Sequence, residues 1–74
     1  MMIDNTAIIG DKVKLGEGVR IGPRAIIRGD VTIGKNTVVD ARALIEGNTV
    51  IGSNNYIGIG TVIGNPPQDL KYNG

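Results

Sequence analysis

Three polar side chains that can take part in chemistry lie close together near the end of the chain, in the stretch QDLKY. The Asp69 carboxylate can accept hydrogen bonds from a hydroxyl group, and the Gln68 amide can donate or accept them. The Lys71 ammonium can offset the charge of a phosphate or of a developing oxyanion. These residue types suit contact with a hydroxylated or phosphorylated ligand, and their use depends on the elements that position them.

A second charged stretch, IIRGDVTIGKNT, places Arg28 and Asp30 on either side of Gly29. The stretch resembles the Arg-Gly-Asp segment of γ-class carbonic anhydrases, in which that arginine and aspartate bridge subunits near a zinc site. Those enzymes bind zinc through histidines, and this chain has none, so the zinc-hydroxide mechanism is not expected. The simpler interpretation is that Arg28 and Asp30 lie at a solvated turn.

The composition excludes several classes of function. The chain has no cysteine and no histidine, which removes thiolate chemistry and the commonest metal ligand and general base. We therefore expect no metal site, no cofactor and no catalytic residue. Basic and acidic residues are interspersed and the net charge is +1, so no basic surface for nucleic acid is predicted. No stretch is long enough for a membrane span or reads as a secretory signal, and a cytoplasmic protein is expected.

The element that positions these residues is a six-residue repeat. A helix with 3.6 residues per turn cannot keep a period of six on one face, whereas short strands separated by turns can. A small β-sandwich needs longer strands and would not require an unbroken period. The large aliphatic residues of the repeat are Ile3, Ile9, Leu15, Ile21, Ile27, Ile33, Val39, Ile45, Ile51, Ile57 and Ile63.

A second row, two residues before each aliphatic residue, should face inward as well, because side chains alternate along a strand. Asn55 is the one residue in this row, apart from threonines, that is polar, and Thr37 one coil below is its expected hydrogen-bond partner. Turns are expected three residues after the aliphatic positions, at residues that tolerate a left-handed backbone. These turn residues are Gly18, Asp30, Asn36, Asn48, Asn54 and Gly60.

Each hexapeptide is then one short strand and one corner, and the predicted fold is an all-β, single-stranded parallel β-helix. Three hexapeptides close a triangular coil of about eighteen residues, so the chain forms about three and a half coils. This six-residue repeat resembles that of the left-handed hexapeptide-repeat proteins, and left-handed coiling is implied by that resemblance alone.

The residue just before each aliphatic position should point outward and stack on its equivalents one coil away. One of the three resulting columns is apolar throughout, which favours a subunit contact, although β propensity alone is an alternative explanation. Hexapeptide proteins resembling this one are typically homotrimers, and end-to-end stacking of uncapped coils is also plausible. The columns are Ile8, Ile26, Leu44 and Val62; Lys14, Thr32, Val50 and Gln68; and Arg20, Val38 and Tyr56.

The six-residue repeat ends at Ile63. Pro66 and Pro67 follow, and because proline has no backbone N–H, neither can donate a strand hydrogen bond. We expect a β-helix over residues 1–64 and a polar exit loop over residues 65–74. The coils followed by IG..PQDLKY.G closely resemble the amino-terminal part of UDP-N-acetylglucosamine acyltransferases of lipid A biosynthesis. The resemblance covers essentially the whole chain but only the first part of such an enzyme.

The resemblance implies that Gln68, Asp69 and Lys71 contact the sugar nucleotide and the acyl chain in a cleft between subunits. It also implies an acyl carrier protein as donor and a histidine from a later coil as general base. We therefore expect an amino-terminal portion that is not catalytically competent alone. Two alternatives remain: a minimal self-assembling β-helix that serves as a structural module, and a relic of a γ-class carbonic anhydrase without zinc ligands.

Overall fold

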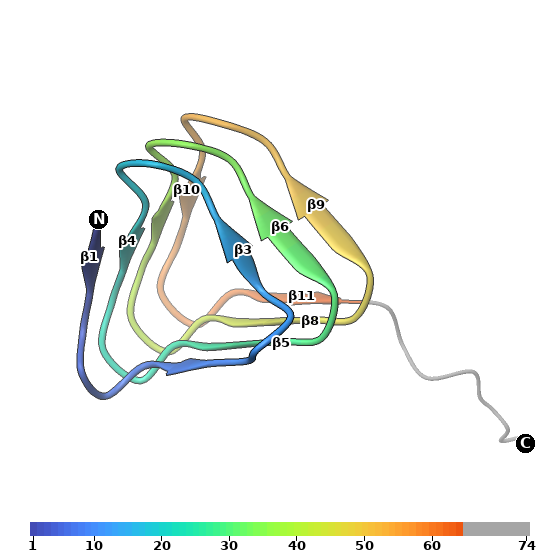
Figure 1. Cartoon of the computed structure of the whole chain (residues 1–74). Helices are drawn as coiled ribbons and strands as arrows, with labels where there is room; N and C mark the ends of the chain where they lie inside the picture. Colours follow the sequence, from blue (N-terminus) through green and yellow to red (C-terminus); the bar gives the residue numbers. More distant parts are fainter. Residues whose placement is uncertain (65–74) are drawn as a thin grey trace, which may run out of the picture.

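The computed structural model describes residues 1–64, which wind into a triangular β-solenoid without helices (Figure 1). Each of the eleven strands contains one aliphatic residue of the six-residue repeat, so the repeat and the strands coincide. The strands are β1 (Met2–Ile3), β2 (Ile8–Ile9), β3 (Lys14–Leu15), β4 (Arg20–Ile21), β5 (Ile26–Arg28), β6 (Val31–Ile33), β7 (Val38–Val39), β8 (Leu44–Glu46), β9 (Thr49–Ile51), β10 (Tyr56–Ile57) and β11 (Val62–Gly64).

Three parallel sheets form the sides of the triangle. Sheet A has the order β1-β4-β7-β10, sheet B the order β11-β8-β5-β2, and sheet C the order β3-β6-β9. Paired residues are eighteen positions apart throughout, as in Ile9 with Ile27 and Ile27 with Ile45. The predicted all-β hexapeptide β-helix is thereby confirmed, and its winding is that of a left-handed β-helix-like solenoid. No helix long and apolar enough to cross a membrane occurs in residues 1–64.

Both predicted inward rows form the core, which is densest in the middle coils. There the aliphatic and small residues alternate along each strand and stack on their equivalents, so each is covered from above and below. Burial of this apolar surface is the main stabilising contribution of such a fold. The fully buried apolar residues are Val19, Ile21, Ala25, Ile27, Val31, Ile33, Val39, Ala43 and Ile45.

Thr37 is the buried polar residue of this core, with an exposed fraction of 0%. Its hydroxyl donates a hydrogen bond to the Gly52 carbonyl at 2.7 Å and accepts one from the Asn55 backbone N–H at 3.2 Å. The prediction that the Asn55 side chain is buried against Thr37 is wrong. Asn55 is exposed because it lies in the last described coil, and its amide donates to the Ser53 carbonyl at 3.4 Å.

The corners confirm some of the predicted left-handed residues and correct others. Gly18, Asn36, Asn54 and Gly60 have positive φ as predicted, but Asp30 and Asn48 do not. Gly29 (φ 88°) and Gly47 (φ 84°) replace them one position earlier, because a residue without Cβ takes this conformation at the lowest cost. Arg24 and Arg42, three residues after Ile21 and Val39, also have positive φ; the spacing of the repeat marks these positions, but the residue type does not.

Candidate functional site

The predicted apolar column lies on the outer face of sheet B. Strand register stacks Ile8 on Ile26, Ile26 on Leu44, and Leu44 on Val62. Ile8 and Val62 are 60% and 71% exposed, whereas Ile26 and Leu44 are half-buried. We call these four residues the sheet B stripe. The structure thus brings together the residues predicted as a subunit contact, and their use as a contact stays a prediction.

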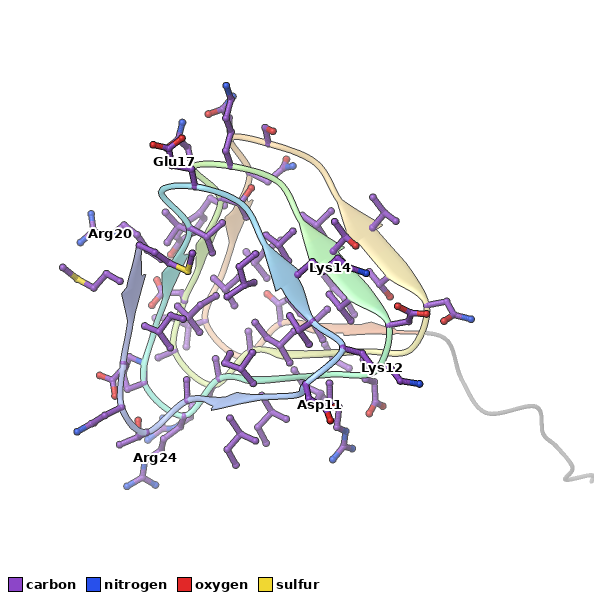
Figure 2. The ribbon with its side chains drawn as sticks, viewed as in Figure 1. Asp11, Lys12, Lys14, Glu17, Arg20 and Arg24 are labelled. Carbon is purple, nitrogen blue, oxygen red and sulfur yellow. The ribbon has the colours of Figure 1, made fainter. Side chains whose placement is uncertain are left out.

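The other two outward columns are mixed in character. On sheet C, Val50 is 83% exposed and stacks on Thr32, which stacks on Lys14. On sheet A, the column contains Arg20, Val38 and Tyr56. Figure 2 shows Lys14 and Arg20 pointing away from the interior of the triangle, which aliphatic side chains fill. Neither column forms a continuous apolar surface like the sheet B stripe.

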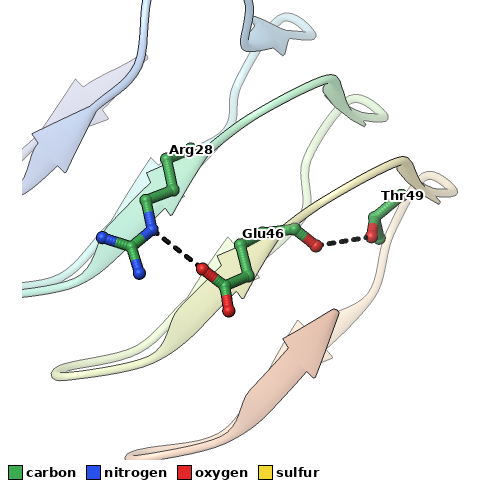
Figure 3. A network of polar contacts seen from close by, with 3 residues as sticks. All are labelled: Arg28, Glu46 and Thr49. Carbon is green, nitrogen blue, oxygen red and sulfur yellow. Dashed lines mark hydrogen bonds and ion pairs between the residues drawn. The ribbon is translucent and has the colours of Figure 1, made fainter. Parts of the chain in front are cut away.

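At the corner between sheets B and C, Arg28 and Glu46 form an ion pair between adjacent coils (Figure 3). Arg28 Nε lies 2.8 Å from Glu46 Oε1, and the two side chains are 60% and 35% exposed. The Glu46 carbonyl accepts a hydrogen bond from the Thr49 hydroxyl at 3.1 Å. The expectation that Arg28 lies at a solvated corner agrees with this exposure. The ion pair with Glu46 is an additional feature, and water screening limits such a pair to about 0.2–1 kcal/mol.

A shallow groove of about 330 Å³ lies on the outer side of sheet A, between Asp4 and Asp40. Its floor includes Gly22, which stands between the two aspartates in their column. Asp4 accepts hydrogen bonds from the Thr6 backbone and hydroxyl, and these bonds hold the pKa of Asp4 below its ordinary value.

Asp40 is likewise engaged within the chain. The Tyr56 hydroxyl and the Ala41 backbone N–H both donate to it, and in that order they lower the pKa of Asp40. The same hydrogen bond raises the pKa of Tyr56, because losing its proton would leave two negative charges side by side. Both carboxylates of the groove are thus ionised at neutral pH and already have intrachain donors.

The predicted ligand residues Gln68, Asp69 and Lys71 lie outside the described residues, as does the predicted exit loop over residues 65–74. The sequence analysis missed Arg28 with Glu46 and Asp40 with Tyr56. Residues eighteen apart stack directly, so the eighteen-residue offset was a signal for the first pair. Within residues 1–64, no three His, Cys, Asp or Glu side chains are grouped so that they could hold a metal ion.

Residues 30–65 match the family model described as "Bacterial transferase hexapeptide (six repeats)". The match covers the middle and last described coils and agrees with the strand register, so the chain is a hexapeptide-repeat β-solenoid similar to those of bacterial transferases. Comparison with curated proteins and with solved structures gives no significant match.

Proposed function

We propose that this chain is the β-helical scaffold of an acyltransferase-like protein that assembles as a homotrimer through the sheet B stripe. The repeat match to bacterial transferase hexapeptides supports the class of protein. The stripe supports the assembly, because it is the one continuous apolar column among the outward columns of residues 1–64. A trimer also suits a fold whose small core leaves a single chain with little apolar burial.

The proposed substrates are a UDP-sugar, UDP-N-acetylglucosamine, and an acyl group carried by acyl carrier protein. The observation that carries this proposal is the stretch QDLKY, which begins four residues after β11. Gln68, Asp69 and Lys71 are the proposed binding residues, with Lys71 opposite phosphate and Asp69 accepting from sugar hydroxyls. A general base of the histidine type would have to come from outside these 74 residues, which contain no histidine.

Titration calorimetry with UDP-N-acetylglucosamine tests the ligand. We expect the original chain to bind with measurable heat. The apparent affinity should fall at least tenfold in an Asp69→Asn, Lys71→Met variant, since each charged contact is worth about 1.5–3 kcal/mol. The control is Lys14→Met, which removes one exposed lysine from sheet C. Heat that is the same in all three proteins would argue against a site at QDLKY.

Sedimentation tests the assembly independently of any ligand. We expect the trimer mass to fall to that of a monomer when Ile26 and Leu44 are both changed to lysine, because charges would enter the centre of the apolar contact. Val50→Lys is the matched control. Val50 is more exposed than Ile26 and Leu44, but the residues that stack with it on sheet C, Thr32 and Lys14, are polar. An unchanged mass in the double variant would exclude the stripe as the contact.

A structural module without a site of its own is the second candidate. It is favoured by the hydrogen bonding of three carboxylates in residues 1–64. Asp4, Asp40 and Glu46 all accept hydrogen bonds from within the chain rather than standing ready for a ligand. This candidate predicts trimers that give no heat with the UDP-sugar, so the two experiments together separate it from the acyltransferase-like scaffold.

A further inference from the structure

The first coil of the solenoid leaves its inward apolar side chains partly uncovered. Ile3 is 41% exposed, whereas Ile21, which carries the same side chain and pairs with it one coil further on, is 3% exposed. Ile9 is half-buried, whereas its partner Ile27 is fully buried. Since the side chains are identical, the difference is that coils cover Ile21 and Ile27 from both sides. The partly exposed inward residues of the first coil are Ile3, Ala7, Ile9, Val13 and Leu15.

Three open strand edges surround these side chains. β1, β2 and β3 are the terminal strands of sheets A, B and C, and Figure 1 shows β1 and β3 in the same outermost coil. The Met2 and Asp4 amides donate to carbonyls of the second coil. The Ile3 amide between them therefore points to the opposite side, where no strand of residues 1–64 lies. Unpaired edges of this kind are templates for further strands, and we call the three edges with their inward side chains the first-coil end.

The last described coil differs, because its inner row is polar. The side chains of Thr49, Asn55 and Thr61 donate hydrogen bonds to carbonyls of their own corners, at 3.1, 3.4 and 2.8 Å respectively. In the first coil the equivalent residues on sheets B and C are Ala7 and Val13, which cannot make such bonds. Head-to-tail stacking would place the apolar first-coil end against this polar row, whereas two first-coil ends placed face to face bury apolar surface on both sides.

The triangular outline of the first-coil end restricts what can cover it. An extended peptide pairs with one of the three edges and leaves the other two open. A second copy of the same coil has three strands at the same spacing, so it meets all three edges at once and covers the inward side chains. Charge does not oppose this contact, because acidic and basic side chains are nearly balanced in the first coil. They are Asp4, Asp11 and Glu17 against Lys12 and Lys14.

We propose that the first-coil ends of two copies of this chain dock on each other across a twofold axis perpendicular to the solenoid axis. Two identical faces form an isologous contact, which closes after two copies, whereas head-to-tail stacking would continue into a filament. The twofold axis reverses the strand direction, so the edges meet as antiparallel pairs. The Ile3 amide, and the Ile9 amide that lies between the donors Ile8 and Gly10, then gain acceptors from the second copy.

This contact is separate from the sheet B stripe and does not require the proposed trimer. Six residues at about 3.3 Å each give the triangle a side of about 20 Å, so two single ends bury an area typical of weak complexes. A trimer formed through the stripe has three first-coil ends that point in the same direction. Three contacts formed together bind more tightly than one, so the proposed docking joins two trimers into an assembly of six chains.

Sedimentation equilibrium over a range of protein concentrations counts both contacts. We expect the original chain to rise from three chains to six with concentration, and the Ile26→Lys, Leu44→Lys variant to rise from one to two. An original chain that stays at three overturns the docking and leaves the trimer, whereas one that rises from one to two leaves the docking and overturns the trimer. A chain that stays monomeric overturns both.

Ile3→Lys tests the position of the contact. It should lower the association constant between trimers at least about tenfold, because docking would bury unpaired ammonium groups. In the undocked chain the long lysine side chain reaches water through the open end, so circular dichroism should show intact coils. Ile57→Lys is the matched control, since Ile57 lies in the same sheet and the same aliphatic row at the opposite end, and it should leave association unchanged. An equal loss in both variants, with intact coils, would overturn docking through the first-coil end.

Amide hydrogen exchange of the original chain tests the strand pairing without any substitution. The Ile3 and Ile9 amides should exchange at least about tenfold more slowly at the concentration that gives six chains than at the concentration that gives three, because docking would hydrogen-bond them. Equal exchange rates at the two concentrations would show that the edges stay unpaired and would overturn this docking geometry.

Discussion

Changing Ile27 to alanine is expected to lower the free energy of unfolding by about 4 kcal/mol. Ile27 is fully buried in the middle of the solenoid, stacked between Ile9 and Ile45. Its truncation removes apolar burial and leaves a cavity that two hydrogen-bonded coils prevent from collapsing. A chain of 74 residues has a total stability of about 4–11 kcal/mol, so this one change consumes much of it.

Ile3→Ala is the matched control, because the chemistry is the same but Ile3 is 41% exposed in β1, which pairs with β4 alone. We expect it to lose less than about 1.5 kcal/mol. The measurement is a urea titration at one protein concentration, since self-association makes apparent stability concentration-dependent. Equal losses at Ile3 and Ile27 would mean that the core is not centred in the middle coils.

The fold could be predicted from the sequence because each six-residue repeat forms one strand and one corner of the solenoid. Each aliphatic position, such as Ile27 or Ile45, lies in its own strand, and the eighteen-residue stacking follows from three strands to a coil. A period of six is incompatible with helices and with long strands, so few architectures compete. The outward column of Ile8, Ile26, Leu44 and Val62 was predictable for the same reason.

The corners were less predictable, because several residue types can take a left-handed backbone there. Both Gly29 and Asp30 tolerate a left-handed backbone, but glycine adopts it at lower cost. The residue with positive φ is therefore Gly29, one position before the predicted Asp30. Arginine is not a residue type that favours this backbone, so at Arg24 and Arg42 the position in the repeat, three residues after Ile21 and Val39, is the one signal. Side-chain pairs across coils, as in Arg28 with Glu46, need both register and rotamer, and the sequence pattern supplies register alone.

The candidate site was predictable only in part, for a physical reason. A site between subunits takes groups from more than one copy, and the spacing of residues in one chain does not show which edges meet. The proposed trimer would cover the sheet B stripe, which the repeat predicts, but the repeat does not show which residues of a neighbouring copy would lie opposite it. Gln68, Asp69 and Lys71 stay a prediction based on resemblance.

Gly34→Ala is the second substitution for which we expect a large loss of stability, about 3 kcal/mol. A Cβ at Gly34 would lie 2.6 Å from both the Gly52 carbonyl carbon and the Ser53 nitrogen of the next coil. These are backbone atoms, which cannot rotate away as a side chain can. Relief therefore requires separating two coils where the Gly34 N–H donates to the Ile51 carbonyl at 2.7 Å. The measurement is the urea midpoint, with amide hydrogen exchange at the corners between sheets C and A.

Gly10→Ala separates close coil packing from the general flexibility of glycine. Gly10 follows Ile9 as Gly34 follows Ile33, and neither glycine has positive φ, so the unfolded chain loses the same freedom in both variants. A Cβ at Gly10 would come no closer than 3.2 Å, to Arg28 Cα, and we expect a change of less than about 1 kcal/mol. A large loss at Gly34 with a small one at Gly10 would show that the glycine after each aliphatic residue is required only where the backbone of the next coil would lie within 3 Å of an added Cβ. Equal effects would instead assign the requirement to the backbone of the repeat itself.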